Sequence, residues 1–186
     1  MQRADINEQA DAIRPCNADD VPAILRIINA AAEVYRGVIP ADRWHEPYMP
    51  TEELLSEIAA GVAFAGYVPD GELVGVMGIQ HVKNVRLIRH AYVLPHWQGL
   101  GVGSKLIASL RSGDEPPVLI GTWRAANWAI GFYQRHGFAL VPDEAIAPLL
   151  KTYWSIPERQ IETSVVLTLP ALSVRSAVKL IAESSE

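Results

Sequence analysis

The sequence has a single cysteine and no apolar run long enough to span a membrane. Cys16 has no second cysteine with which to form a disulfide within the 186 residues. No stretch of about 18 apolar residues occurs, and the N-terminus lacks the basic start and apolar core of a secretory signal. These absences predict a soluble, cytoplasmic protein that does not engage a membrane.

Lysine and arginine do not cluster anywhere in the chain. There are 16 basic and 21 acidic residues, which give a formal net charge of −5. A nucleic-acid partner needs a concentrated positive surface, so this pattern argues against nucleic acid and favours cationic small molecules. Internal repeats are also missing, and 49% apolar residues over this length suffice for the core of one domain.

Glycine is concentrated in a loop between an apolar strand and a helix. Residues 85–104 read VRLIRHAYVLPHWQGLGVGS, with glycines at 99, 101 and 103. Positions without a Cβ let several backbone N–H groups close on one anion, and the positive end of the following helix dipole adds to them. The loop is therefore predicted to bind phosphate; the alternative is a plain helix entry through a flexible turn.

The kind of phosphate compound follows by elimination. A P-loop needs Gly-Lys-Ser/Thr after a four-residue gap, whereas this chain has Ser104-Lys105 without one. A dinucleotide fingerprint needs a third glycine at position 104 and an acidic residue on a second strand, and both are missing. What remains is Q-x-x-G-x-G after a strand that ends before Pro95, and this pattern resembles the coenzyme A loop of the GNAT acetyltransferase superfamily.

A second motif carries the same resemblance. Residues 127–138 contain N-x-x-x-x-F-Y-x-x-x-G-F, which is similar to the GNAT signature. The resemblance implies that Asn127 contacts the coenzyme arm and that the Tyr133 hydroxyl lies close to the thioester sulfur, where it protonates the leaving thiolate. The alternative for Tyr133 is a core aromatic beside Phe132.

Periodicity predicts a strand-and-helix order that agrees with this family. Strands are expected over residues 13–16, 63–68, 73–80, 85–93, 118–122, 138–141 and 159–169. Helices are expected after an Asp19 cap, over 51–60, from the glycine loop to near Gly113, from Asn127 and over 145–153. The fold class is α/β (α+β), GNAT-like: a central mixed, mostly antiparallel sheet with one parallel, splayed strand pair and helices on both faces.

The predicted domain organisation has three parts. Residues 1–12 form an N-terminal arm, 13–169 the N-acetyltransferase domain, and 170–186 a C-terminal extension with a helical pattern. The apolar stripe of that extension packs either on the domain or on a second subunit, so a homodimer stays open.

The resemblance implies transfer of acetyl from acetyl-CoA to the primary amine of a small molecule by direct attack, without a metal. A backbone N–H near Val93 would polarise the thioester carbonyl. The residues that would bind the coenzyme are Tyr92, Val93, Gln98, Gly99, Leu100, Gly101, Val102, Gly103, Ser104, Asn127 and Tyr133. Two alternatives stay open: a protein or peptide N-acetyltransferase, and a non-catalytic acyl-CoA-binding regulatory module.

The general base is not supplied by the resemblance. On the strand from Val85, alternation places Leu87 and Arg89 on the same face as Ala91 and Val93, and neither is a base. His90 lies on the opposite face unless a bulge interrupts the alternation. His90 is taken as the candidate catalytic residue. The other candidates for the base are Glu33, Glu46 and Glu162.

Residues 33–50 are dense in proline and aromatic side chains. The prolines rule out a continuous helix, and such a loop can line an acceptor pocket or simply cover the core. The predicted substrate-binding residues are Glu33, Tyr35, Trp44 and Tyr48. The Tyr-x-x-x-Ile-Pro and Pro-Tyr-Met turns of this loop resemble those of the phosphinothricin-type acetyltransferases.

Overall fold

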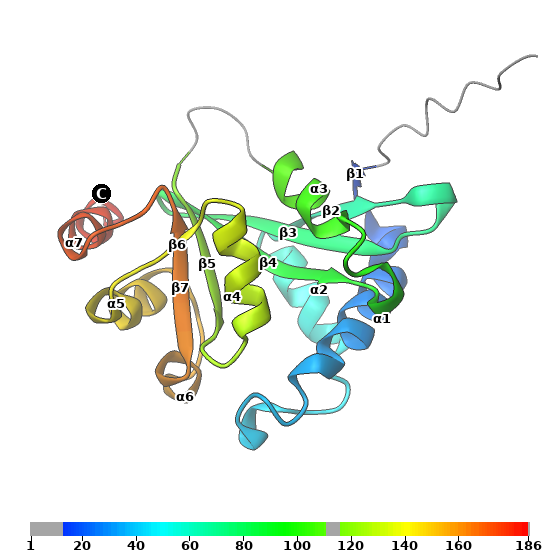
Figure 1. Ribbon diagram of the computed structural model, residues 1–186, viewed down its shortest axis with the longest axis horizontal. Helices are drawn as coiled ribbons and strands as arrows, with labels where there is room; N and C mark the ends of the chain where they lie inside the picture. Colours follow the sequence, from blue (N-terminus) through cyan, green and yellow to red (C-terminus); the bar gives the residue numbers. More distant parts are fainter. Residues whose placement is uncertain (1–12, 111–115, 186) are drawn as a thin grey trace, which may run out of the picture.

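Strands from the whole length of the chain form one mixed sheet. The computed structural model describes residues 13–110 and 116–185, and within them seven strands follow the order β1-β2-β3-β4-β5-β7-β6 (Figure 1). The strands are β1 Ile13–Pro15, β2 Ala63–Tyr67, β3 Gly75–Val82, β4 Val85–Val93, β5 Val118–Trp123, β6 Ala139–Leu140 and β7 Ser164–Leu169. The α-helices that cover them are α1 Val21–Ala32, α2 Thr51–Ala59, α3 Val102–Ser109, α4 Asn127–Arg135, α5 Asp143–Tyr153, α6 Glu158–Glu162 and α7 Val174–Glu183.

The predicted sheet is confirmed. Neighbouring strands are antiparallel except β4 and β5, which run parallel with α3 as the crossover between them. A parallel pair needs such a crossover, which explains why the glycine loop and its helix lie between these two strands. β6 pairs antiparallel with β7, in keeping with the mostly antiparallel sheet that was predicted.

Helices cover both faces of the sheet. In Figure 1, α3 lies on one side of the β3–β4 half, whereas α1 and α2 lie on the other; α4 and α5 flank β5 and β7 from opposite sides. Each helix turns an apolar stripe inward: α1 buries Ile24, Ile27 and Ile28, and α3 buries Leu106 and Ile107. The buried residues of α1 have the i, i+3, i+4 spacing of an amphipathic helix, and those of α3 lie together with Val102 on one buried face.

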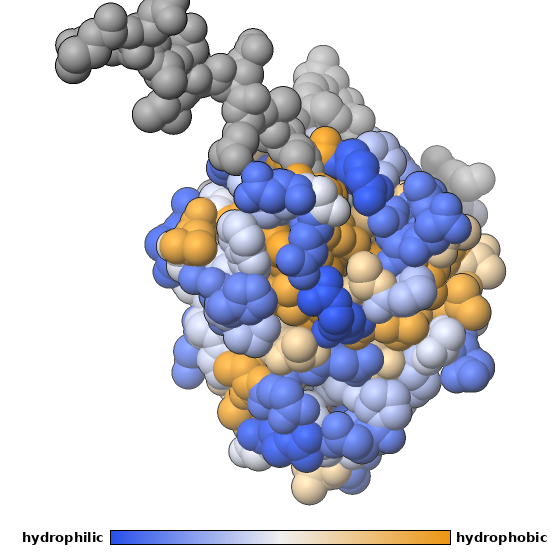
Figure 2. Space-filling view, turned by 90° about the vertical axis from the view of Figure 1, so that its right-hand side faces the viewer, coloured by the Kyte–Doolittle hydropathy of each residue, from blue (hydrophilic) through white to orange (hydrophobic). Residues whose placement is uncertain are grey.

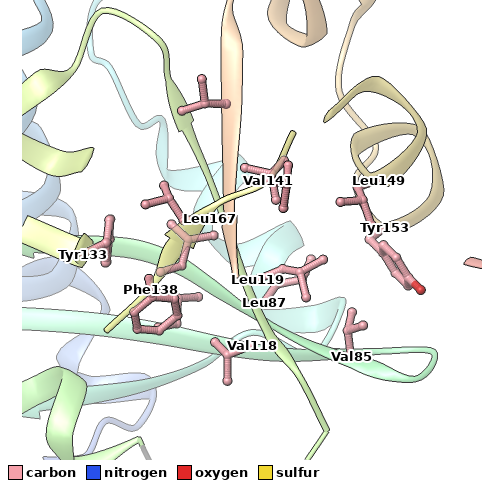
Figure 3. Close-up of a cluster of buried hydrophobic side chains, with 14 of the residues drawn as sticks. Val85, Leu87, Val118, Leu119, Tyr133, Phe138, Val141, Leu149, Tyr153 and Leu167 are labelled. Carbon is pink, nitrogen blue, oxygen red and sulfur yellow. The ribbon is translucent and has the colours of Figure 1, made fainter. Parts of the chain in front are cut away.

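The strand β5 lies between two apolar layers. In Figure 3, Tyr133 and Phe138 lie on one side of the β5–β7 strands, and Leu149 and Tyr153 of α5 lie on the other. β5 is correspondingly apolar at Val118, Leu119 and Ile120, all of them buried. At the end of the molecule where α1 and the β4–α3 connection lie, the surface is mostly polar, with apolar side chains visible between polar ones (Figure 2).

Helix α7 packs on the domain. Ala177 and Leu180 are buried, and the side-chain amide of Asn84 donates to the Leu180 carbonyl over 2.9 Å. The Tyr153 hydroxyl donates to the oxygen of the same side-chain amide, Asn84 Oδ1, over 2.9 Å. Val178 stays 61% exposed on the outer side of the helix.

Two local predictions are wrong. Asn17, and not Asp19, caps the first turn: its side chain accepts from the Asp19 N–H, and it forms a capping box with Asp20. Residues 159–162 belong to helix α6, because Pro157 sets the start of the helix and β7 begins only at Ser164.

Some expectations fall on residues that the structure does not describe. The arm over residues 1–12 and the helix end near Gly113 lie outside the described residues. None of the helices formed by residues 13–110 and 116–185 has the length and apolar character that crossing a bilayer requires.

Candidate active site

The parallel strands β4 and β5 part after a short shared stretch. They pair only from Arg86↔Val118 to Ile88↔Ile120. Beyond this point β4 continues to Val93 beside β3, and β5 continues to Trp123 beside β7. The sheet therefore opens into a wedge.

A cavity of about 730 Å³ lies at this wedge, bordered by β4, the glycine loop, α4 and the end of α1. Most predicted coenzyme residues line it: Tyr92, Val93, Gln98, Gly99, Gly101, Val102, Gly103, Ser104 and Tyr133. Leu100 and Asn127 do not. Leu100 is 64% exposed, and Asn127 is the first residue of α4.

The glycines of the loop have two different structural roles. Gly99 and Gly101 have φ of +77° and +82°, and a Cβ at either position would meet nothing within 4 Å. They are needed for a left-handed backbone that other residues adopt at a cost. At Gly103 a Cβ would lie 3.1 Å from the Phe132 ring, so this glycine allows α3 to pack against α4.

The loop presents backbone donors to the cavity. The first bond at the start of α3 runs from Lys105 N to Gly101 O, so the N–H groups of Val102, Gly103 and Ser104 precede any intrahelical acceptor. These donors lie at the positive end of the α3 dipole. The Gln98 side chain donates to the Val93 carbonyl over 2.9 Å and so ties the loop to the end of β4.

The end of α4 adds groups that the sequence analysis did not identify. Arg135 and His136 line the large cavity, and His136 Nε2 lies 3.0 Å from Ser104 Oγ. A cation and a second hydrogen-bonding side chain therefore lie beside the backbone donors of α3. Only the packing of α4 on α3 brings them there, although a basic residue in the last turn of a helix is visible in sequence.

A second cavity of about 320 Å³ adjoins the first and is bordered by α2, the 33–50 loop and the segment that joins α5 to α6. Tyr35 and Tyr48, two of the predicted substrate-binding residues, line it. Trp44 lies behind this wall, with its ring centroid 5.4 Å from that of Tyr48. Glu33 lies outside both walls and forms an ion pair with Arg36.

The two cavities meet where the strands part. The residues that line both are Tyr35, Ile88, His90, Tyr92, Gly121 and Thr122. A group bound in one cavity can thus reach a group bound in the other. Tyr35 at this junction has its pKa raised to about 12, because burial and the nearby Tyr48 outweigh its hydrogen bond to Thr122.

A β-bulge in β4 brings His90 to the junction. Arg89 pairs with Gly78 and Tyr92 with Val76, so two β4 residues oppose the single residue Met77. His90 adopts φ +49° there, in the left-handed region. The bulge changes the parity of the strand: Tyr92, and not Ala91 or Val93, shares the face of Arg89. The face assignment made from strict alternation is wrong for this reason.

His90 contacts a carboxylate that sequence reasoning missed. Its Nε2 hydrogen-bonds Glu57 Oε2, and Arg89 pairs with Glu57 Oε1 at 3.1 Å. Glu57 lies one turn after the fully buried Leu54 of α2, which directs it toward the sheet. Burial disfavours the charged carboxylate, but His90 and Arg89 outweigh it and hold the pKa of Glu57 below its usual value.

The remaining base candidates lie elsewhere. Glu33 and Glu46 both pair with Arg36, and Glu162 pairs with Arg159. All three carboxylates are more than half exposed, and none lines either cavity. Of the four candidates, His90 alone reaches the junction.

Tyr133 lies in the wall of the large cavity with 7% of its surface exposed. Burial, and after it the nearby Tyr35, raises the pKa of its hydroxyl. The phenol therefore remains protonated at neutral pH and has a proton to donate. Its ring also packs edge-on against Phe132 and Phe138, so it belongs to the core as well as to the cavity.

Known proteins share the fold of this chain. Residues 61–140 match the family model described as Acetyltransferase (GNAT) domain. No curated protein matches the chain. Among solved structures, it is similar to the PaiA N-acetyltransferase from Thermoplasma acidophilum in complex with coenzyme A, with 17% identity, a TM-score of 0.63, and coverage of 84% of this chain and 96% of that one.

Two further structures are similar. N-acetylglutamate synthase from Neisseria gonorrhoeae, complexed with coenzyme A and N-acetyl-glutamate, has 19% identity and a TM-score of 0.58 over 87% of this chain and 35% of that one. A GNAT family acetyltransferase from Brucella melitensis in complex with acetyl-CoA has 24% identity and a TM-score of 0.51 over 68% and 81%. Residues 61–140 thus carry the match to the GNAT acetyltransferase domain, and the chain shares its fold with these solved acetyltransferase structures.

Proposed function

We propose that the protein is an N-acetyltransferase that uses acetyl-CoA and a small-molecule primary amine. The observation that carries this proposal is the meeting of two cavities at His90, where the strands part. One cavity has the backbone donors that suit a phosphate-bearing coenzyme, and the other has an acid–base pair in its wall. The narrower resemblance to phosphinothricin-type acetyltransferases stays a prediction.

The large cavity fits the coenzyme by its chemistry and its size. Its volume of about 730 Å³ lies within the range of cofactor sites, roughly 300–1,000 Å³. The N–H groups of Val102, Gly103 and Ser104, with Arg135 nearby, suit the coenzyme's phosphates. When bound, acetyl-CoA supplies an acetyl group as a thioester: the amine nitrogen forms a C–N bond with the carbonyl carbon, and the C–S bond breaks to release CoA.

The backbone of β4 offers a donor in the wedge. Leu94 N donates to Val74 O on the β3 side. Because backbone groups alternate between the two edges of a strand, the N–H of Val93 points to the other edge, which faces the parting of the strands. A donor there would stabilise the negative charge that develops on a carbonyl oxygen during acyl transfer.

His90 would take the proton from the amine. With its Nε2–H donating to the Glu57 carboxylate, the other ring nitrogen, Nδ1, carries the lone pair. Glu57 fixes this tautomer and stabilises the imidazolium that forms, because its lowered pKa keeps it ionised. Tyr133 would donate its proton to the departing sulfur.

The size of the second cavity favours a small acceptor over a peptide. Its volume is about 320 Å³, and the 33–50 loop and the α5–α6 connection form its walls. A peptide acceptor needs a groove through which the chain can continue on both sides. A regulatory module without chemistry would not need an acid–base pair beside the coenzyme site.

The test is release of free CoA from acetyl-CoA with a panel of small amines and peptides, for the wild type and for His90→Gln. We expect turnover with small amines, and a loss of kcat of about 10²- to 10⁴-fold in the variant with the acetyl-CoA Kd preserved. Turnover with peptides alone would reject the small-molecule assignment. Acetyl-CoA binding without turnover of any amine or peptide would favour the regulatory module.

A further inference from the structure

In the wall of the smaller cavity, one arginine has no partner among the residues that the structure describes. Arg43 lines its wall, and the Nε of this side chain is buried without a hydrogen-bond partner in the described part of the chain. Arg43 also makes no ion pair with any acidic residue in 13–110 or 116–185. The adjacent Trp44 Nε1 is also buried without a hydrogen-bond partner in that part of the chain. This turn therefore has two buried N–H donors for which the described residues provide no acceptor.

The other basic groups of this cavity are already engaged. Arg89 pairs with Glu57 at 3.1 Å and donates to Gln80 Oε1 over 2.9 Å. His45 Nδ1 lies 2.8 Å from the Pro47 carbonyl. Arg43 is therefore the cation that remains available to a bound molecule.

A buried guanidinium donor without an acceptor is costly, and an arginine fork matches a carboxylate in geometry and charge. Building on the proposed function, we propose that the acceptor is a small amino acid whose carboxylate binds Arg43 while its amine faces His90. A cavity of about 320 Å³ has room for roughly ten waters at about 30 Å³ each, enough for a small amino acid.

The same wall contains one acidic group that bears on this assignment. Glu53 of α2 is exposed and lines the cavity one turn before Glu57. If Glu53 dominated recognition, the preferred acceptor would be a diamine, because a second ammonium group would bind that carboxylate. Diamines are therefore the competing class in the test.

The experiment compares each of the twenty L-amino acids with its decarboxylated amine, and includes a series of linear diamines. Binding to the protein with CoA present is measured by calorimetry, and turnover by release of CoA from acetyl-CoA. We expect at least one amino acid to bind at least tenfold more tightly than its decarboxylated counterpart. In Arg43→Gln, this preference should fall to within twofold, while the Kd for acetyl-CoA stays unchanged.

Two further variants make the result specific. Arg124→Gln removes the same charge from an arginine that lines neither cavity, and it should keep the preference. Arg43→Lys keeps the charge without the fork, and it should retain part of the preference, which would also show that Arg43→Gln does not act through misfolding.

Failure of this inference is distinct from failure of the proposed function. Tighter binding of diamines than of amino acids, or equal losses in Arg43→Gln for an amino acid and its decarboxylated amine, would overturn the carboxylate site. Amino acids that bind through Arg43 but are never acetylated would support the site and reject the acetyltransferase activity instead.

Discussion

At the scale of single residues, the proposed mechanism gives the His90 imidazole and the Tyr133 phenol opposite tasks. His90 hydrogen-bonds the Glu57 carboxylate, whereas burial raises the pKa of Tyr133, so that its phenol keeps its proton. The two groups line a common cavity, so the proposed proton uptake and proton donation would occur within one cavity.

The first prediction concerns Tyr133→Phe. This change keeps the ring that packs on Phe132 and Phe138 and removes only the hydroxyl. A general-acid role predicts a fall in kcat of about 10²- to 10⁴-fold, with acetyl-CoA affinity nearly preserved. Single-turnover rates and the coenzyme Kd are the measurements. A kcat within twofold of wild type would remove Tyr133 from the mechanism, and intermediate loss with weakened binding would mean that the hydroxyl only positions the sulfur.

The second prediction concerns pH and Glu57. Because the folded-state pKa of Glu57 lies below its usual value of 4.5, this carboxylate adds stability above pH 4.5 that is lost as the pH falls through the lower, folded-state pKa. Urea unfolding of the wild type and Glu57→Gln should differ most near neutral pH and converge in acid. Glu46→Gln, at an exposed ion pair, is the control and should shift stability little at any pH. A pH-independent gap for Glu57→Gln would contradict the pairing with His90 and Arg89.

Residues differ in how visible they are from sequence. The glycine loop and Tyr133 follow from local spacing, because a helix start and a helix face are set within about ten residues. Glu57 and Arg43 reach the site only because α2 and the 33–50 loop pack beside the end of β4. No local pattern distinguishes these two side chains from an ordinary solvent-exposed charge.

At the scale of elements, the β4 bulge and the glycine loop determine what faces the wedge. Strict alternation along β4 gave the wrong face because the extra residue at His90 interrupts the period of two. The strand itself, its parallel partner and the following helix were all predicted, since their apolar patterns persist over several residues. Helix α6 was missed because five residues carry too little periodicity to tell a short helix from the start of a strand.

The third prediction compares two glycines with nearly equal backbone angles. Gly101 has φ +82° and Gly71 has φ +85°, and neither would crowd a Cβ. Alanine at either position should therefore cost a similar amount of folding stability, about 1–2 kcal/mol. Only Gly101→Ala should also weaken acetyl-CoA binding, by about tenfold or more, because Gly101 is the N-cap of the helix that presents the N–H groups. Calorimetry that gave the same coenzyme Kd for both variants would argue against binding by this loop.

The fourth prediction concerns the 33–50 loop. Tyr48 lines the smaller cavity, and Trp44 supports it from behind while the Arg36 guanidinium lies 4.5 Å above the Trp44 ring. Tyr48→Ala should raise the acceptor KM severalfold with the coenzyme Kd unchanged, and Trp44→Ala should have a smaller effect on KM. An unaltered acceptor KM in the double variant would mean that the loop is only structural cover.

At the scale of the whole molecule, the two halves of the sheet contribute different parts of the site. The antiparallel β2–β4 half, with α3, supplies the glycine loop and His90, and the β5–β7 half supplies Thr122, helix α4 with Tyr133, and the α5–α6 connection. Figure 1 shows these halves as differently directed parts of one twisted sheet. The order of strands and helices in the sequence predicted this sheet. The position of the smaller cavity depends on the 33–50 loop and the α5–α6 connection, which have no periodic pattern of apolar residues.

The parting of β4 and β5 also has a kinetic consequence. Because the two cavities share only the six lining residues at their junction, neither of the proposed substrates would have to leave before the other enters. Initial rates measured against both substrates should therefore give intersecting double-reciprocal lines, with CoA competing against acetyl-CoA but not against the amine. Parallel lines would instead require an acetylated protein between two half-reactions, with the first product gone before the second substrate arrives.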